Sequence, residues 1–298
     1  MQPANTAYIY TFFTILFWGG AASAFKLALS HISPITLLWT ASSISLLVIT
    51  FILIFTSKIK LIFKLSWRQW IVLLLLGALN PFLYYVILFK AYDLLPGQVA
   101  MSLNYLWPVM LALLSVPILK HTLNLKSLLS ISLSFIGAII IASGGNLSAW
   151  GQLNPTGVML ALVSTIVWAL YWLLSTKMQV DAVIKLFIGF ISGTILSVGY
   201  AQMKGIQLTG YNEALWLPVF YVGVFEMGFT FFIWLKALQL APNAAKLGNL
   251  IYLTPFLSLL LLALILKEET QISTIAGLIV IIMGILSQQY WNRDKAKD

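Results

Sequence analysis

The tetrapeptide Tyr105-Leu106-Trp107-Pro108 recurs 147 residues later as Tyr252-Leu253-Thr254-Pro255, each time within a long apolar segment. The same offset relates Leu119-Lys120 to Leu266-Lys267. Matches that keep one offset over this distance indicate an internal repeat, in which the second half of the chain is built like the first. The sequence therefore predicts two structurally related halves.

Two further matches extend the repeat toward the start of each half. Lys90-Ala91 recurs as Lys236-Ala237 at an offset of 146, and Trp18 matches Trp168 at an offset of 150. The Trp18 match predicts that the first apolar segment is a structural helix and not a removable leader. The absence of Lys or Arg before this segment supports the same interpretation.

The composition requires an apolar environment. Of the 298 residues, 61% are hydrophobic and 8% are charged, with a mean hydropathy of +0.97, whereas soluble domains are about 25% charged. This excludes a soluble globular enzyme, a disordered chain and a nucleic-acid-binding module. The net charge of +9 comes from bases dispersed over short connections. The chain has no cysteine, so disulfides and thiolate sites are excluded.

We expect an all-α membrane protein, because a backbone in lipid must satisfy its own hydrogen bonds and about 20 apolar residues cross the hydrocarbon core. Ten segments meet this requirement: 6–29, 34–56, 68–92, 96–119, 126–143, 157–178, 184–203, 213–238, 243–266 and 272–291. The connections between them are short and leave no room for a soluble domain.

The distribution of Lys and Arg predicts the orientation. With the amino terminus in the cytoplasm, the inside segments hold 13 of these bases and the outside segments hold 4. Because basic residues are retained on the cytoplasmic side, we expect both termini inside, in a multi-pass protein of the inner (plasma) membrane.

Each half contains five spans, an odd number, so the second half is inserted upside down. We place the first repeat at residues 1–145, the second at 155–292 and a cytoplasmic tail at 293–298. Inverted repeats are typical of secondary transporters, because one repeat pair adopts two arrangements of similar energy that open to opposite sides. The substrate then binds near the midplane, between the repeats.

This pattern resembles the drug/metabolite transporter superfamily, in its form with ten spans and two EamA-type repeats. Asn104-Tyr105-Leu106-Trp107-Pro108 is similar to a motif of the bacterial aromatic amino acid exporters in that superfamily. Trp168-Ala169-Leu170-Tyr171 and Tyr252-Leu253-Thr254-Pro255 are similar to their counterparts there. The resemblance implies a cavity formed mainly by spans 1, 3, 4, 6, 8 and 9, and export of an amino acid, with aromatic ones as candidates.

The fourth span carries the first group of candidate site residues. Asn104 and Trp107 are three residues apart and share a helix face, and Pro108 breaks the hydrogen-bond ladder. Pro255 is the repeat-related break. We interpret both prolines as kinks beside the substrate cavity, with packing kinks that touch no ligand as the alternative.

Aromatic residues form the second group. Trp18, Trp107 and Trp168 lie near the middle of their spans, where an interfacial belt cannot explain them. Rings of this kind stack well on an aromatic or planar cationic substrate, and core packing explains any single ring equally well. The tyrosines that we add to the candidate substrate site are Tyr84, Tyr105, Tyr171 and Tyr252.

Polar groups at membrane depth form the third group. Asn80, Asn104 and Asn249 offer amides for a substrate, and Asn80 precedes a proline, so it also fits a local helix break. Glu226 is the only acid well inside a span, and such residues are usually functional. It has three candidate roles, namely binding a substrate ammonium, accepting a proton, or pairing with a lysine. The aromatic amino acid exporters have no acid at this place.

Several alternatives stay open. A carrier of the same fold with another substrate, such as a nucleotide-like metabolite or a cationic drug, fits the same residues, with proton coupling through Glu226. A membrane-embedded enzyme is disfavoured because no nucleotide-binding loop and no metal-ligand spacing occur. We therefore expect no cofactor and no metal, with a small-molecule substrate and the lipid bilayer as partners. A channel is a further alternative, and it would conduct without saturation.

Overall fold

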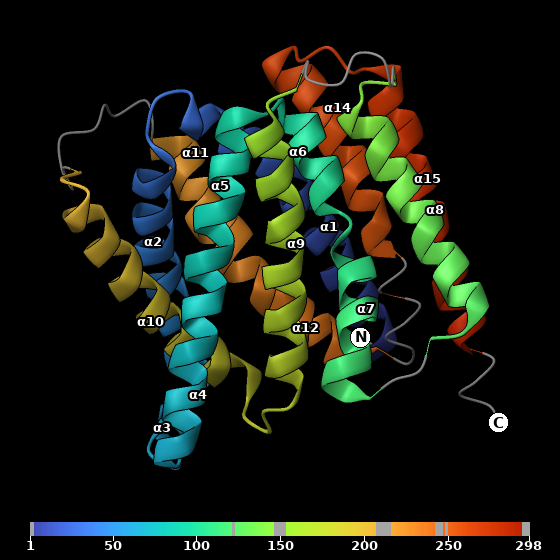
Figure 1. Ribbon diagram of the computed structural model, residues 1–298. Coiled ribbons are helices and arrows are strands. Elements are labelled where there is room, and N and C mark those ends of the chain that lie inside the picture. Colours follow the sequence, from blue (N-terminus) through green and yellow to red (C-terminus); the bar gives the residue numbers. More distant parts are fainter. Residues whose placement is uncertain are drawn as a thin grey trace.

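The computed structural model describes residues 3–120, 123–145, 153–206, 216–241, 247 and 250–293, and all their regular elements are helices. Singly or joined end to end, these helices form segments that run between the two ends of the bundle (Figure 1). They are α1 (Pro3–Leu29), α2 (Pro34–Phe55), α4 (Trp67–Gly77) with η1 (Ala78–Leu83) and α5 (Tyr84–Leu94), α6 (Gly97–Asn104) with α7 (Trp107–Leu119), α8 (Leu125–Ala142), α9 (Pro155–Thr176), α10 (Ala182–Met203), α11 (Trp216–Tyr221) with η4 (Val222–Phe229) and α12 (Thr230–Leu240), η5 (Ile251–Leu253) with α14 (Thr254–Leu266), and α15 (Ile272–Arg293).

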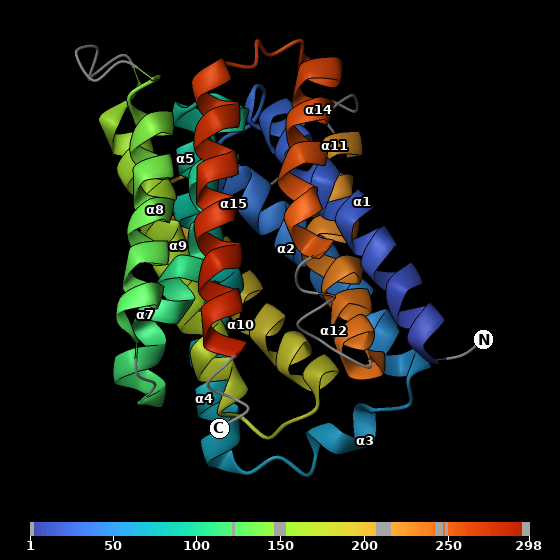
Figure 2. The same ribbon diagram turned by 90° about the vertical axis from the view of Figure 1, so that its right-hand side faces the viewer.

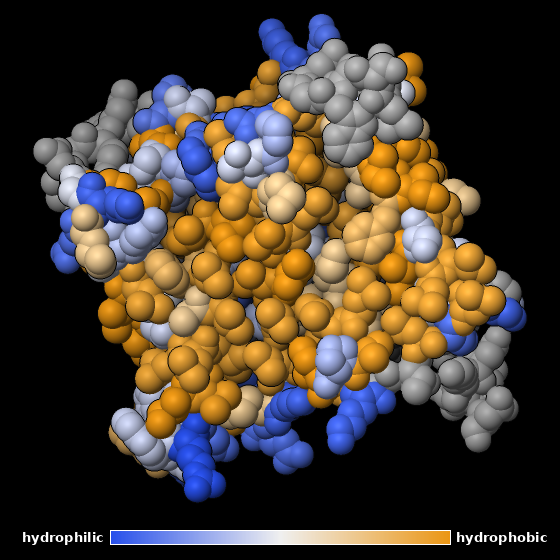
Figure 3. Space-filling view, in the orientation of Figure 1, coloured by the Kyte–Doolittle hydropathy of each residue, from blue (hydrophilic) through white to orange (hydrophobic). Residues whose placement is uncertain are grey.

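The prediction of ten transmembrane helices is confirmed. Within the described residues, eight continuous or broken helices have the length and hydropathy to span a bilayer, and Ile251–Leu266 and Ile272–Gln288 are shorter apolar helices. The predicted ninth span starts at residue 243, and residues 242–246, 248 and 249, including Asn249, lie outside the described part of the chain. Apolar side chains cover the middle of the molecule, and hydrophilic ones gather at its two ends (Figure 3).

Four of the spans are interrupted. Asn80 has non-helical backbone angles just before Pro81, which widens the middle of the third span into η1, a π-type turn. The repeat-related η4 widens the eighth span in the same way. Pro108 and Pro255 each lie in the first turn of a new helix, α7 and α14. In the first turn a backbone nitrogen donates no hydrogen bond within the helix, so a proline fits there without losing one. The breaks therefore occur in corresponding spans of the two halves.

Helix packing follows the repeat. In the second half α9 packs against α5 and α7, and in the first half α1 packs against α12 and α14. The pairs α2–α10 and α8–α15 close the two edges of the bundle, and Figures 1 and 2 both show α8 beside α15. Glycines allow this last contact, because a Cβ on Gly137 would lie 2.5 Å from the carbonyl oxygen of Gly277.

The two ends of the bundle are named here for reference. The α3 face carries the short helix α3 (Ile59–Ile62), the start of α8 and the end of α7, and the far face carries the ends of α1 and α14 (Figures 1 and 2). Both α7 and α14 end on a lysine in the left-handed conformation, Lys120 (φ 59°) and Lys267 (φ 54°). These lysines are repeat mates at opposite faces, which agrees with the inverted arrangement.

Candidate functional site

A cavity of about 1120 Å³ lies between helices of both halves. At the α3 face it reaches the ends of α7, α9, α12 and α15, where Lys120, Thr176, Leu238 and Gln288 line it. The resemblance implies a cavity formed by spans 1, 3, 4, 6, 8 and 9. The structure adds span 10, which contributes Ile285 and Gln288.

The structure brings most of the predicted site residues together. Those that line the cavity are Trp18, Tyr84, Asn104, Tyr105, Trp107, Pro108, Trp168, Glu226 and Tyr252. Three others do not line it: Asn80, Tyr171 and Pro255 are buried in the surrounding helices. Their assignment to a substrate site stays a prediction.

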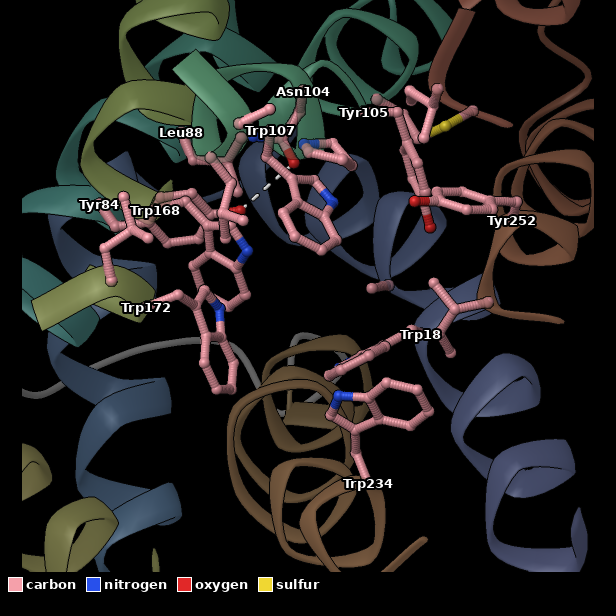
Figure 4. A pocket seen from close by; sticks show the side chains of 18 of the residues that line it. Trp18, Tyr84, Leu88, Asn104, Tyr105, Trp107, Trp168, Trp172, Trp234 and Tyr252 are labelled. Atoms are coloured by element: carbon pink, nitrogen blue, oxygen red, sulfur yellow. Dashed lines mark hydrogen bonds between the residues drawn. The ribbon is translucent and has the colours of Figure 1, made fainter. Parts of the chain in front are cut away.

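Aromatic rings surround the open centre of the cavity (Figure 4). The ring centres of Trp168 and Tyr84 are 4.5 Å apart, and Trp172 meets Trp168 edge to face at 5.8 Å. On the other side Trp18 lies 6.1 Å from Trp234. The rings therefore present both faces and edges, and this arrangement suits a flat or positively charged ligand.

Asn104 orients part of this aromatic wall. Its Oδ1 accepts a hydrogen bond from the Tyr84 hydroxyl at 3.3 Å, drawn in Figure 4, and its Nδ2 donates to Ser164 Oγ at 2.9 Å. The amide thus links α6 to both α5 and α9. Because the Tyr84 ring packs against the Trp168 ring at a tilt of 35°, Asn104 holds the first ring directly and supports the second through it.

Glu226 stands in the widened turn η4 and lines the cavity. Its Oε1 accepts from the Tyr85 hydroxyl at 3.1 Å, and its backbone carbonyl accepts from Trp18 Nε1 at 3.3 Å. Its Oε2 is buried and has no hydrogen-bond partner among the described residues. The ion pairs among the described residues are Lys58–Asp181 and Lys90–Asp93. Of the three candidate roles, pairing with a lysine is therefore absent within the described part of the chain.

The far face is closed above the cavity. Lys26 Nζ donates to the carbonyl oxygens of Tyr92 at 2.9 Å and Leu95 at 3.0 Å, where α5 ends. Gln98 Nε2 donates to the carbonyl oxygen of Glu269, and the Glu268 carboxylate lies beside the backbone N–H groups of Gly97 and Gln98. These contacts, which we call the outer seal, connect α1, α6 and the loop after α14.

Sequence reasoning missed Trp234, which lines the cavity beside Trp18. The signal was present in the repeat, because an offset of 146 relates Trp234 to Leu88, and Leu88 also lines the cavity. An offset of 150 similarly relates Trp172 to Ala22, and both line it. Among the described residues, no group of three His, Cys, Asp or Glu side chains is placed to hold a metal.

A broken ten-helix bundle in two inverted halves around one aromatic cavity is a specific combination. The sequence profile of the EamA-like transporter family matches residues 5–143 and 155–287. The chain belongs to the EamA-like transporter family. The EamA fold, with two repeats of five helices, accounts for the two matched segments, and the expected place in the drug/metabolite transporter superfamily is confirmed.

Relatives of this EamA family member carry transporter names. "Uncharacterized transporter YvbV" of Bacillus subtilis (strain 168) is 24% identical over 96% of this chain and 92% of its own length. An "Uncharacterized transporter" of Archaeoglobus fulgidus is 25% identical over 91% and 93%. A solved crystal structure matches 98% of this chain and 99% of its own with a TM-score of 0.69 at 21% identity, and it supports the fold alone. The EamA member is thus a multi-pass membrane transporter.

Proposed function

We propose that the protein is a secondary transporter that moves an amino acid, with aromatic ones as the first candidates, outward across the inner membrane by alternating access. The observation that carries this proposal is the 1120 Å³ cavity between the two repeats, closed at the far face and reaching the α3 face. Such a cavity binds its substrate from one side and releases it to the other after the repeats move, without a covalent step. The proposed repeats are residues 1–145 and 155–292.

The α3 face is the cytoplasmic face in this proposal. Lys58, Lys60, Lys64 and Arg68 surround α3, and basic residues favour the cytoplasmic side. The start of α1 and the end of α15 lie on the same half of the bundle as α3 (Figure 2), so we place both termini and the tail 293–298 inside. The described conformation then accepts substrate from the cytoplasm, as an exporter requires.

The lining residues support an amino acid with an apolar side chain. Glu226 is the acid at depth in the described lining and supplies a negative charge for an ammonium group. Trp107 and Trp168 offer faces to the substrate ring. Lys120 is the basic residue of the described lining and lies at the mouth. The substrate carboxylate therefore relies on neutral donors inside the cavity, such as the indole N–H groups.

The test is flux of radiolabelled phenylalanine and tryptophan in proteoliposomes, with the Trp107→Ala variant. We expect saturable flux that falls at least tenfold in the variant, because a stacked ring contributes over about 1.4 kcal/mol. Trp67→Ala is the matched control, since Trp67 is 76% exposed on the outside of α4. Absence of flux for both amino acids with folded protein would remove the amino acid assignment.

A second candidate function is favoured by Glu226. An acid without a cationic partner, surrounded by rings, is also the arrangement that binds an organic cation in exchange for protons. In this case organic ammonium compounds compete with phenylalanine flux and Glu226→Gln abolishes its pH dependence. Pure amino acid transport predicts that such cations do not compete. Unchanged pH dependence in Glu226→Gln would remove a coupling role for this residue.

A further inference from the structure

The two widened turns occupy equivalent places in the repeat. At the offset of 146 that relates Lys90-Ala91 to Lys236-Ala237, Asn80 in η1 is the repeat mate of Glu226 in η4. The packing is equivalent too, because η1 packs against α9 and α10, and η4 packs against α1 and α2. Equivalent positions of the two repeats therefore carry an amide in the first repeat and an acid in the second.

The surroundings of these two side chains differ in the described conformation. Asn80 is 2% exposed, lies outside the cavity and is contacted by the Tyr171 hydroxyl. Its carbonyl oxygen lies 3.8 Å from the position of a Cβ on Gly189 in α10. Glu226 instead lines the cavity that reaches the α3 face. The turn around Asn80 is therefore shut off from the cavity, whereas the turn around Glu226 faces it.

Inverted repeats switch sides by exchanging the conformations of their two halves. After that exchange the turn around Asn80 opens to the far face, and the turn around Glu226 takes the closed surroundings that Asn80 has now. From this juxtaposition we infer that Glu226 loses its contact with the cavity whenever the cavity faces outward, and that its charge must be neutralised before the protein switches. This rests on the proposed alternating-access function.

The physical reason is the cost of an isolated charge. A carboxylate in a closed apolar site is far less stable than the same group in a wet cavity, unless a proton or a cation accompanies it. In the described part of the chain, the titratable side chains that interact with Glu226 are tyrosines, which supply no positive charge: Tyr84, Tyr85, Tyr92, Tyr105 and Tyr221. A proton or a substrate ammonium must therefore travel with Glu226 through the switch. Asn80 imposes no such condition.

This asymmetry predicts that the acid sets the resting conformation. Ionised Glu226 favours the conformation in which the cavity is open toward the α3 face. Removing the acid removes this preference between the two conformations. Moving the acid to the mate position, in Asn80→Asp/Glu226→Asn, keeps the number of acids and reverses the preference. The described conformation then becomes the less populated one.

The chain has no native cysteine, so a single reporter thiol gives a clean measurement. Thr176→Cys places it on α9 at the cavity mouth of the α3 face, where a charged thiol reagent reaches it when the cavity opens to that face. We would measure its labelling rate in nanodiscs in the Glu226 protein, in Glu226→Gln and in Asn80→Asp/Glu226→Asn. We expect labelling to be fastest in the Glu226 protein, intermediate in Glu226→Gln and slowest in the double variant. The fastest and slowest rates should differ by at least about tenfold.

The pH dependence separates the three proteins further. Acidification slows the labelling of every thiol because the thiolate is the reactive form, so each rate is compared with this intrinsic pH dependence. Relative to it, acidification neutralises the acid and therefore slows labelling when the acid is at 226, leaves Glu226→Gln unchanged, and speeds labelling when the acid is at 80. Equal rates in all three, or one common pH slope, would overturn the inference. If the double variant does not fold, the contrast between the Glu226 protein and Glu226→Gln still decides it. Labelling needs no substrate, so a failed substrate assignment leaves this test intact.

Discussion

The two ends of the cavity differ in how their helices are held. At the far face, side chains lie at the end of α5 and the start of α6, since Lys26 donates to carbonyl oxygens at the end of α5 and the Glu268 carboxylate lies beside N–H groups of α6. At the α3 face, the repeat mate of Lys26 at an offset of 150 is Thr176, which lines the open mouth. Polar capping thus accompanies closure, although both ends derive from the same repeated helices.

The largest expected effect comes from Lys26→Ala. Losing an ammonium that binds two carbonyl oxygens costs about 2 kcal/mol, or roughly 30-fold in the population of the open seal. The measurement is the labelling rate of a thiol at Leu95→Cys, because Leu95 is buried in the seal. Lys90→Ala is the matched control, since its ion pair with Asp93 is at the surface and contributes little. Equal labelling in both variants would contradict a sealing role for Lys26.

Gln98→Ala tests a neutral contact of the same seal. Its Nε2 donates to the carbonyl oxygen of Glu269, and one neutral hydrogen bond contributes about 1 kcal/mol. We expect labelling of Leu95→Cys to rise roughly fivefold, less than in Lys26→Ala. A larger effect than that of Lys26→Ala would reverse the ranking of charged and neutral contacts.

Glu268 makes the seal sensitive to pH. Burial raises the pKa of Glu268 in the closed seal, opposed by the N–H groups of Gly97 and Gln98 and by Lys26. When the seal opens, the pKa of the Glu268 carboxyl returns to its ordinary value. The closed form therefore binds the proton more tightly, and acidification just above the ordinary glutamate range, about 4.3, stabilises closure. Relative to the intrinsic pH dependence of thiol reactivity, labelling of Leu95→Cys slows further on acidification, and Glu268→Gln removes this additional dependence. Faster labelling in acid would show the opposite linkage.

The smallest effect is expected at the α3 face itself. Lys58 Nζ lies 2.5 Å from Asp181 Oδ2, near the surface, and such pairs contribute about 0–1 kcal/mol. Lys58→Gln should therefore change the rate of Thr176→Cys labelling less than about fivefold. A change as large as that of Lys26→Ala at the far face would mean that this ion pair, too, controls an end of the cavity.

Much of the site could be predicted because its signals are local. The mid-span position of Trp18 and Trp168, the break at Pro108 and the isolated acid Glu226 are each visible in one segment, and the structure places all four at the cavity. Asn80 and Tyr171 show equally strong local signals, yet they face other helices. Helical spacing gives the relative direction of side chains on one helix, but not how that helix is turned toward its neighbours.

The sequence by itself determined the ten apolar spans, the inverted repeat and the family resemblance, because hydropathy and repetition are properties of the chain alone. Only the tertiary structure decided that Trp234 joins the cavity, that Glu226 lacks a lysine partner among the described residues, and that the far face is closed. These facts depend on how the two halves pack against each other. Two related halves can pack in two arrangements of similar energy, which open the cavity to opposite faces. The amino-acid sequence is the same in both arrangements, so it does not tell which face is closed.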